Sequence, residues 1–195
     1  IAIDAMGGEN APFKNIEGVS VFLKKNKNNN DVFFNLYGNE ELIKKEIVKY
    51  NIFTNQYKIF PSSTIVSDEE TPLTAIKNSK DSSMWNSINS QITSNSNITL
   101  SAGNTGVLFV VSRMLLKTID SVSKPALAGL WPNEKNMHVV LDLGANVECD
   151  EKNLIDFSEM GAALYKALFP ADTPRVALLN IGSEEIKGTE ILKKT

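Results

Sequence analysis

Apolar runs of strand length alternate along the chain with longer segments in which apolar residues recur at helical spacing. The runs that predict strands lie at 1–5, 32–38, 56–62, 98–102, 138–143 and 175–181, and PALAGLW at 125–131 is expected to be extended. Helices are predicted over 11–25, 39–50, 72–95 (one or two helices), 104–117 and 152–168. This alternation favours an α/β fold with a mostly parallel sheet and helices on both faces.

Composition narrows the class of protein. The 195 residues are 42% hydrophobic and 22% charged, as in a soluble globular protein, and we expect one domain over 1–195. A further helix has only begun where the sequence stops at Thr195, so a C-terminal part is expected to be missing. A net charge of -3 gives no support to nucleic-acid binding.

The single cysteine and single histidine limit the chemistry further. Cys149 alone cannot form an internal disulfide, and it is interpreted as an inert thiol. One histidine makes a zinc or iron site improbable, so no metal and no cofactor is predicted. The chain has no apolar run of about 18 residues and begins with a strand, which predicts a cytoplasmic protein.

Turns rich in glycine and asparagine follow four of the predicted strands. They are DAMGGEN (4–10), GNTG (103–106), GANVE (144–148) and IGSEE (181–185). Carboxyl ends of parallel strands share one edge of a sheet, where open α/β folds bind ligands. Glycine lets a ligand approach the backbone, and small polar residues at a helix start leave N–H groups for an anion. The turns therefore predict a phosphate site, with candidate residues Asp4, Gly7, Gly8, Ser101, Gly103, Asn104, Thr105, Gly106, Asp142, Gly144, Asn146, Asn180, Gly182 and Ser183.

Each of these residues also has a purely structural interpretation. Asn104 or Ser183 alone is more often a helix cap, and Asp4 and Asp142 could simply bond turn amides. A glycine pair such as Gly7-Gly8 usually makes only a tight turn. Dinucleotide, P-loop and nucleophile-elbow motifs are absent from the sequence. The recurrence of the turns, and not any single turn, carries the prediction of a site.

Six motifs in order give a resemblance to a known family. IDAMGGENAP, SAGNTGVL, KPALAG, LDLGANVEC, FSEMG and PRVALLNIGSEEIKG resemble motifs of the bacterial phosphate acyltransferase family, PlsX. The resemblance implies a three-layer α/β/α, Rossmann-like fold similar to that of isocitrate dehydrogenase and phosphotransacetylase. It implies transfer of a fatty acyl group from acyl carrier protein to inorganic phosphate, giving acyl phosphate for phospholipid synthesis. It also implies a homodimer that associates peripherally with the inner face of the plasma membrane, and it adds Lys124, before PAL, to the phosphate contacts.

For this reaction we expect Asn104 and Asn146 to donate to the thioester oxygen and Lys187 to balance phosphate charge. Lys187, Lys193 and Lys194 are expected to dock the acidic carrier protein. Three alternatives stay open: a short-chain phosphotransacylase that uses acyl-coenzyme A, a non-catalytic anion-binding module, and a metal-dependent dehydrogenase on the same fold. The dehydrogenase is disfavoured because no cluster of acidic metal ligands is evident in the sequence.

Overall fold

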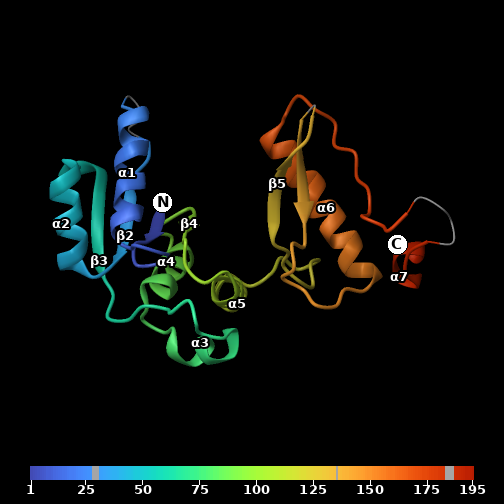
Figure 1. Ribbon diagram of the computed structural model, residues 1–195, viewed down its shortest axis with the longest axis horizontal. Coiled ribbons are helices and arrows are strands. Elements are labelled where there is room, and N and C mark those ends of the chain that lie inside the picture. The colour runs from blue at the N-terminus through green and yellow to red at the C-terminus, as the bar shows by residue number, and fades with distance from the viewer. Residues whose placement is uncertain (28–30, 135, 183–186) are drawn as a thin grey trace. The chain divides into compact units, whose positions relative to one another are not determined.

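A computed structural model describes the chain from residue 1 to 195 except residues 28–30, 135 and 183–186 (Figure 1). The chain divides into two compact units, residues 1–117 and residues 118–195. Each unit is described by itself.

The first unit is built on a four-stranded sheet in the order β3-β2-β1-β4, in which every pair is parallel. The strands are β1 (Ala2–Asp4), β2 (Phe34–Gly38), β3 (Tyr57–Pro61) and β4 (Thr99–Leu100). Ile3 of β1 lies opposite Leu36 on one side and Leu100 on the other. The parallel sheet predicted from the alternating pattern is confirmed for this unit.

Helices connect the strands of the first unit. They are α1 (Phe13–Lys25), α2 (Glu40–Tyr50), α3 (Pro72–Asn78), α4 (Ser83–Ile92) and α5 (Thr105–Leu116), with a short 3-10 turn η1 (Thr54–Gln56) before β3. The Asn39 side chain caps α2 by accepting from the Leu42 N–H, and the Ser82 hydroxyl caps α4 by accepting from the Trp85 N–H. Such caps satisfy donors that have no partner within the helix.

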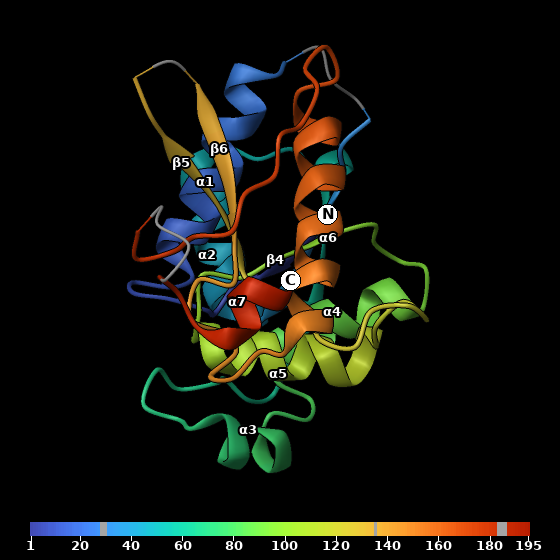
Figure 2. The same cartoon turned by 90° about the vertical axis from the view of Figure 1, so that its right-hand side faces the viewer.

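Two apolar clusters place these helices on opposite faces of the sheet and give three α/β/α layers. On one face, Ile3 and Leu36 of the sheet pack with Ile16 of α1 and Ile43 of α2. Side chains alternate along a strand, so Ala2 and Asp4 point to the other face, which α4 covers. Helix α4 packs against α5 (Figure 2). The buried apolar residues that these two helices contribute are Met84, Ile88, Val107 and Val111.

The second unit contains an antiparallel hairpin of β5 (Ala128–Pro132) and β6 (Met137–Leu141), with Leu130 opposite Val139. Helix α6 (Glu151–Leu168) packs against β6, and a short α7 (Glu190–Lys194) follows. A reciprocal capping box between Asp150 and Asn153 begins α6. The predicted extended segment and the strand at 138–143 are therefore present, but they pair with each other in a separate sheet.

The strand predicted over 175–181 is wrong. The segment has no regular secondary structure, although its apolar run matches that of a buried strand. Leu179 and Ile181 are 89% and 85% exposed, so the described residues of the second unit leave these two side chains uncovered. A strand exists only by hydrogen bonding to a neighbour, and β5 and β6 bond to each other.

Candidate functional site

The loops after β1 and β4 lie against each other. Because β1 and β4 are paired in parallel, both strands end at the same edge of the sheet. A Cβ on Gly7 would lie 2.4 Å from Asp4 Oδ2 and 2.9 Å from the Gly103 nitrogen, closer than real contacts allow. Gly7 is therefore glycine because the second loop occupies the space that a side chain needs.

Two more glycines show how close this approach is. Gly8 has a φ of +89°, and a Cβ there would lie 2.6 Å from the Ala102 carbonyl oxygen. A Cβ on Gly103 would lie 3.0 Å from Met84 Cε of α4. The two loops and the start of α4 thus form one packed cluster, in which the backbone of one loop closely approaches the backbone of the other. We call residues 4–8 and 101–103 the paired loops.

Asn15 of α1 holds the loop at 4–8 through side-chain hydrogen bonds. Its Nδ2 donates to the Ala5 carbonyl at 2.9 Å and the Gly7 carbonyl at 3.0 Å, with a longer contact of 3.4 Å to the Asp4 carbonyl. The sequence analysis missed this residue. The only sign of its role in the sequence is that it is an asparagine near the start of a helix. Helix periodicity does not show which loop the side chain will contact.

Asp4 is buried in the centre of the paired loops. Its side chain is 1% exposed, and its Oδ2 accepts a hydrogen bond of 2.7 Å from the Ser101 hydroxyl. The Ser101 oxygen in turn accepts from the Gly103 N–H at 3.2 Å. A continuous chain of hydrogen bonds therefore joins the end of β1 to the loop after β4.

Burial raises the pKa of the Asp4 carboxyl above its ordinary value. The hydroxyls of Ser83 and Ser101 and the N–H groups of Met6 and Gly7 act in the opposite direction and lower this pKa, but less than burial raises it. Ser83, the first residue of α4, is also 1% exposed. Its hydroxyl is near enough to act on the carboxyl, yet among the described residues neither Ser83 Oγ nor Asp4 Oδ1 makes a hydrogen bond of normal geometry. Ser83 was not among the predicted residues.

The second of the paired loops leads directly into α5. Asn104 is the N-cap, and its Oδ1 accepts from the Val107 N–H at 3.1 Å. Its Nδ2 donates to the carbonyls of Asp68 and Glu70 at 3.1 and 2.9 Å. Asn104 therefore caps α5 and also binds the loop at 68–70, which precedes α3. Its donation to a thioester oxygen stays a prediction. For that donation, Nδ2 must release one of these carbonyls and bind the substrate oxygen instead.

Thr105 and Gly106 form the first turn of α5, whose N–H groups lack carbonyl partners inside the helix. A Cβ on Gly106 would lie 3.3 Å from Pro72 Cγ, so α3 approaches this turn closely. The positive end of the helix dipole is at the same place. The first unit thus combines a helix N-terminus with the glycine backbone of the paired loops.

The turn after β6 in the second unit has a different construction. Asp142 has a φ of +61° and Gly144 a φ of +85°. Asp142 Oδ1 accepts from both the backbone N–H and the Nδ2 of Asn146, at 3.1 and 2.9 Å. Asn146 Nδ2 also donates to the Pro125 carbonyl at 3.0 Å. The Asp and Asn of this turn therefore bind mainly each other and the backbone.

Lys124 and Cys149 lie beside this turn. Lys124 Nζ donates to the Glu148 carbonyl at 2.9 Å, and Cys149 Sγ is 3.5 Å from Asp142 Oδ2. Burial, followed by the hydrogen bond to Asp142, raises the pKa of the Cys149 thiol. A raised pKa lowers the thiolate fraction, which agrees with the interpretation of Cys149 as an inert thiol.

The last predicted turn is described only in part, and Ser183 lies outside the described residues. Asn180 Oδ1 accepts from the Ile181 N–H at 2.8 Å, and its Nδ2 has a contact of 3.5 Å to the Lys187 carbonyl. Gly182 is half-buried and Lys187 is exposed. Because 175–181 is not a strand, this turn does not follow a strand end as the sequence predicted.

The structure therefore brings together only part of the predicted site. Asp4, Gly7, Gly8, Ser101 and Gly103 form one cluster in the first unit, and α5 begins beside it. Lys124, Asp142 and Asn146 form a second cluster in the other unit, with Gly144 in its turn. A single crevice lined by all four turns stays a prediction.

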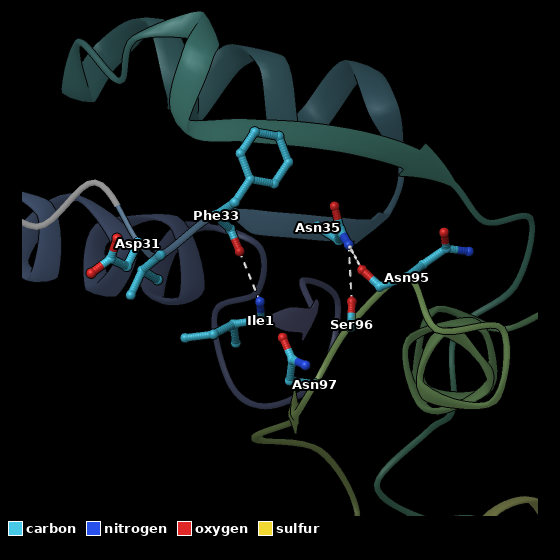
Figure 3. A pocket seen from close by; sticks show the side chains of 8 residues that line it. Ile1, Asp31, Phe33, Asn35, Asn95, Ser96 and Asn97 are labelled. Atoms are coloured by element: carbon cyan, nitrogen blue, oxygen red, sulfur yellow. Dashed lines mark hydrogen bonds between the residues drawn. The ribbon is translucent and has the colours of Figure 1, made fainter.

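A cavity of about 300 Å³ lies at the amino ends of β1 and β2 (Figure 3). Its lining residues are Ile1, Asp31, Val32, Phe33, Asn35, Asn95, Ser96 and Asn97. Asn35 Nδ2 donates across it to the Asn95 carbonyl and to Ser96 Oγ, at 2.8 and 2.9 Å. Parallel strands have their amino and carboxyl ends at opposite edges, so this cavity is separate from the paired loops.

Over the described ranges, no three His, Cys, Asp or Glu side chains come close enough together to hold a metal ion. None of the helices in that part of the chain combines the length and apolar character that a membrane crossing requires.

The fold and the paired loops define an α/β protein with glycine-rich backbone at the carboxyl edge of a parallel sheet, the place where such sheets bind ligands. A family model described as "Fatty acid synthesis protein" matches residues 1–195. The chain belongs to this family.

Three relatives give the degree of similarity. A phosphate acyltransferase of Pelagibacter ubique (strain HTCC1062) is 50% identical over 195 residues, which are 100% of this chain and 57% of that protein. Phosphate acyltransferases of Ehrlichia ruminantium (strain Gardel) and Agrobacterium fabrum are 38% and 37% identical, again over 100% of this chain and over 57% and 54% of their own lengths. The chain thus spans a little over half the length of the curated relatives it matches.

Proposed function

We propose that the chain is part of a phosphate acyltransferase, which moves a fatty acyl group from acyl carrier protein to inorganic phosphate. The observation that carries the proposal is the backbone contact between the paired loops beside the N-terminus of α5. Backbone N–H groups at such a place suit an anion without needing a metal or a cationic cluster. The relatives are phosphate acyltransferases by name, which supports phosphate as the acyl acceptor.

In the proposed reaction a phosphate oxygen attacks the thioester carbonyl carbon. A C–O bond forms, the C–S bond breaks, and the carrier-protein thiolate leaves and takes up a proton. Both reactants are already activated, so the protein contributes mainly by positioning them, which is worth about 7–11 kcal/mol in favourable systems. Donors to the developing oxyanion add about 3–4 kcal/mol each. Asn104 and Asn146 are our candidate donors, and the paired loops with Thr105, Gly106 and Lys124 are our candidates for holding phosphate.

Acyl carrier protein is the proposed donor because the family model describes fatty acid synthesis. We propose exposed lysines near the C-terminal helix as its docking surface. Lys187 is exposed, while Lys193 and Lys194 are 3.9 Å from the carboxylates of Glu190 and Glu151. Pairs this long and this exposed hold a lysine weakly and leave it free to meet an acidic partner. We also propose that the whole protein is cytoplasmic, forms a homodimer and associates peripherally with the membrane.

The experiment measures release of free carrier-protein thiol from long-chain acyl carrier protein, with and without phosphate, by the protein made from the complete gene. We expect release that requires phosphate and saturates with it. Replacement of the donor by short-chain acyl-coenzyme A tests the short-chain alternative, and equal rates with that donor would favour it. Phosphate binding without release from either donor would leave an anion-binding module.

A charge reversal tests the docking surface. Lys187→Glu is expected to raise the KM for acyl carrier protein several-fold, and added salt is expected to raise the wild-type KM as well. Lys24→Glu is the matched control, because Lys24 is exposed at the end of α1 on the other unit. Equal KM values for the two variants would remove Lys187 from the docking surface.

A further inference from the structure

The burial of Asp4 is incompatible with direct contact to a phosphate that enters from solvent. The side chain is 1% exposed, so a phosphate in solvent does not reach it. Its position as the last residue of β1 makes it look like a ligand of the site. The hydrogen bonds give it another role.

Those bonds connect Asp4 to the backbone of the other loop through one side chain. Ser101 Oγ donates to Asp4 Oδ2 at 2.7 Å and accepts from the Gly103 N–H at 3.2 Å. Gly103 immediately precedes Asn104, the N-cap of α5. One carboxyl oxygen therefore links the end of β1 to this loop through side-chain hydrogen bonds.

We propose that Asp4 is a positioning residue and not a phosphate ligand, and that it acts through Ser101 to hold the loop at 101–103 and the N-terminus of α5 where phosphate binds. This inference rests on the proposed function, because it assumes that phosphate binds beside the paired loops. It assigns no contact between Asp4 and any reacting atom.

The surroundings disfavour the charged form of the carboxyl. No ion pair of Asp4 is found among the described residues. Its near neighbours are the hydroxyls of Ser83 and Ser101, and on β2 the register places Tyr37 beside it. An isolated buried carboxylate is costly, whereas a carboxylic acid can donate one hydrogen bond and accept another. Asparagine has the same shape and the same two capacities, so it is expected to replace Asp4 in this role.

The test compares four variants of the protein made from the complete gene. Ser101→Ala removes the bridging hydroxyl, Asp4→Ala removes the carboxyl, and Asp4→Asn keeps an acceptor oxygen. Ser87→Ala is the matched control: Ser87 is a fully buried serine of α4 whose hydroxyl donates to the Met84 carbonyl at 2.8 Å inside the helix. Phosphate KM, acyl-donor KM and the phosphate Kd from calorimetry are measured for each.

We expect Ser101→Ala and Asp4→Ala to raise phosphate KM and Kd about tenfold, with the acyl-donor KM changed less than about twofold. Asp4→Asn should recover most of the loss seen in Asp4→Ala, and Ser87→Ala should match the wild type. Ser101→Ala removes a single oxygen, so it keeps the test valid if Asp4→Ala fails to fold.

An unchanged phosphate Kd in Ser101→Ala would overturn the inference. A parallel rise of both KM values with a lowered Tm would also overturn it, because that is the effect of a general structural defect. A wild-type protein that binds phosphate without turnover removes the acyl-transfer proposal, and calorimetry on Ser101→Ala still decides the positioning role. A wild-type protein that binds no phosphate overturns both.

Discussion

Asp4 and Asp142 each lie at the carboxyl end of an apolar strand and before a glycine turn, yet their roles in the structure differ. Asp4 is buried and bonds to Ser101, 97 positions away, whereas Asp142 Oδ1 accepts from Asn146, 4 positions away. The first turn is completed by another loop and the second by its own residues. The difference comes from the strands, because β1 has parallel neighbours that end beside it while β6 belongs to a two-stranded hairpin.

The glycines of the two turns differ in the same way. Gly7 has neighbours 2.4–2.9 Å from the position that a Cβ would take. Gly144 has nothing within 4 Å of that position, and what favours glycine there is its φ of +85°. A glycine can thus be required by a neighbouring backbone or by its own dihedral angle. Only the first requirement reports on tertiary structure.

The largest expected effect is that of Gly7→Ala. The added methyl would overlap Asp4 Oδ2 and the Gly103 nitrogen, so the paired loops must separate. We expect a loss of about 3 kcal/mol or more in the free energy of unfolding, together with loss of phosphate binding. Denaturant unfolding and calorimetry measure the two quantities.

Gly18→Ala is the control for this substitution. Gly18 lies in α1 with nothing within 4 Å of a Cβ, so alanine should stabilise the protein by about 0.5–1 kcal/mol through helix propensity. Equal effects of Gly7→Ala and Gly18→Ala would show that the paired loops are not in contact.

Asn15→Ala is expected to have the next largest effect. It removes the amide that donates to the carbonyls of Ala5 and Gly7, and the loss should be about 1–3 kcal/mol in the free energy of unfolding. Lys14→Ala is the control, since Lys14 makes an exposed ion pair with Glu17 and an exposed contact with the Phe13 ring, and it should change stability by less than about 1 kcal/mol. If the two variants unfold alike, the first loop does not depend on Asn15.

Gly144→Ala should cost only about 1–2 kcal/mol, because the strain is confined to one left-handed residue. Phosphate affinity at the paired loops should stay as in the wild type. A loss as large as that of Gly7→Ala would contradict the distinction between the two turns.

The smallest expected effect is a dependence of the free energy of unfolding on pH, which Asp4→Asn should abolish. The pKa of Asp4 is raised in the folded protein, so the folded state binds more protons than the unfolded state once pH exceeds the unfolded pKa of about 3.9. Its stabilising contribution is complete below that pH and is lost as pH rises through the folded pKa. Unfolding at a series of pH values above about 4 should show a steeper decline for the wild type than for Asp4→Asn. Parallel curves for the two proteins would show that Asp4 does not titrate with a raised pKa.

Much of the first unit could be predicted from its sequence. Each strand is a short apolar run between helices, and a parallel sheet follows from that order alone. The segment at 175–181 shows the limit, because its apolar run is the same as that of a buried strand and its partner is not encoded locally. The hairpin of β5 and β6 was missed for the same reason, since its two runs were recognised but their pairing was not.

The candidate site shows the same division. The glycines and Asp4 were visible because turn chemistry is local, while Asn15 and Ser83 contact the paired loops only through helix packing. The sequence also could not show that Asp4 is buried. That fact changes its expected role from phosphate ligand to positioning residue.

The central claim is that this chain helps to transfer an acyl group to inorganic phosphate. Phosphorus NMR of long-chain acyl carrier protein incubated with phosphate and the protein made from the complete gene tests it most directly. We expect an acyl phosphate resonance that grows in step with thiol release and is lost in Gly7→Ala. Thiol release with no acyl phosphate would contradict the transfer to phosphate. An undiminished resonance in folded Gly7→Ala would contradict the placement of the phosphate site at the paired loops.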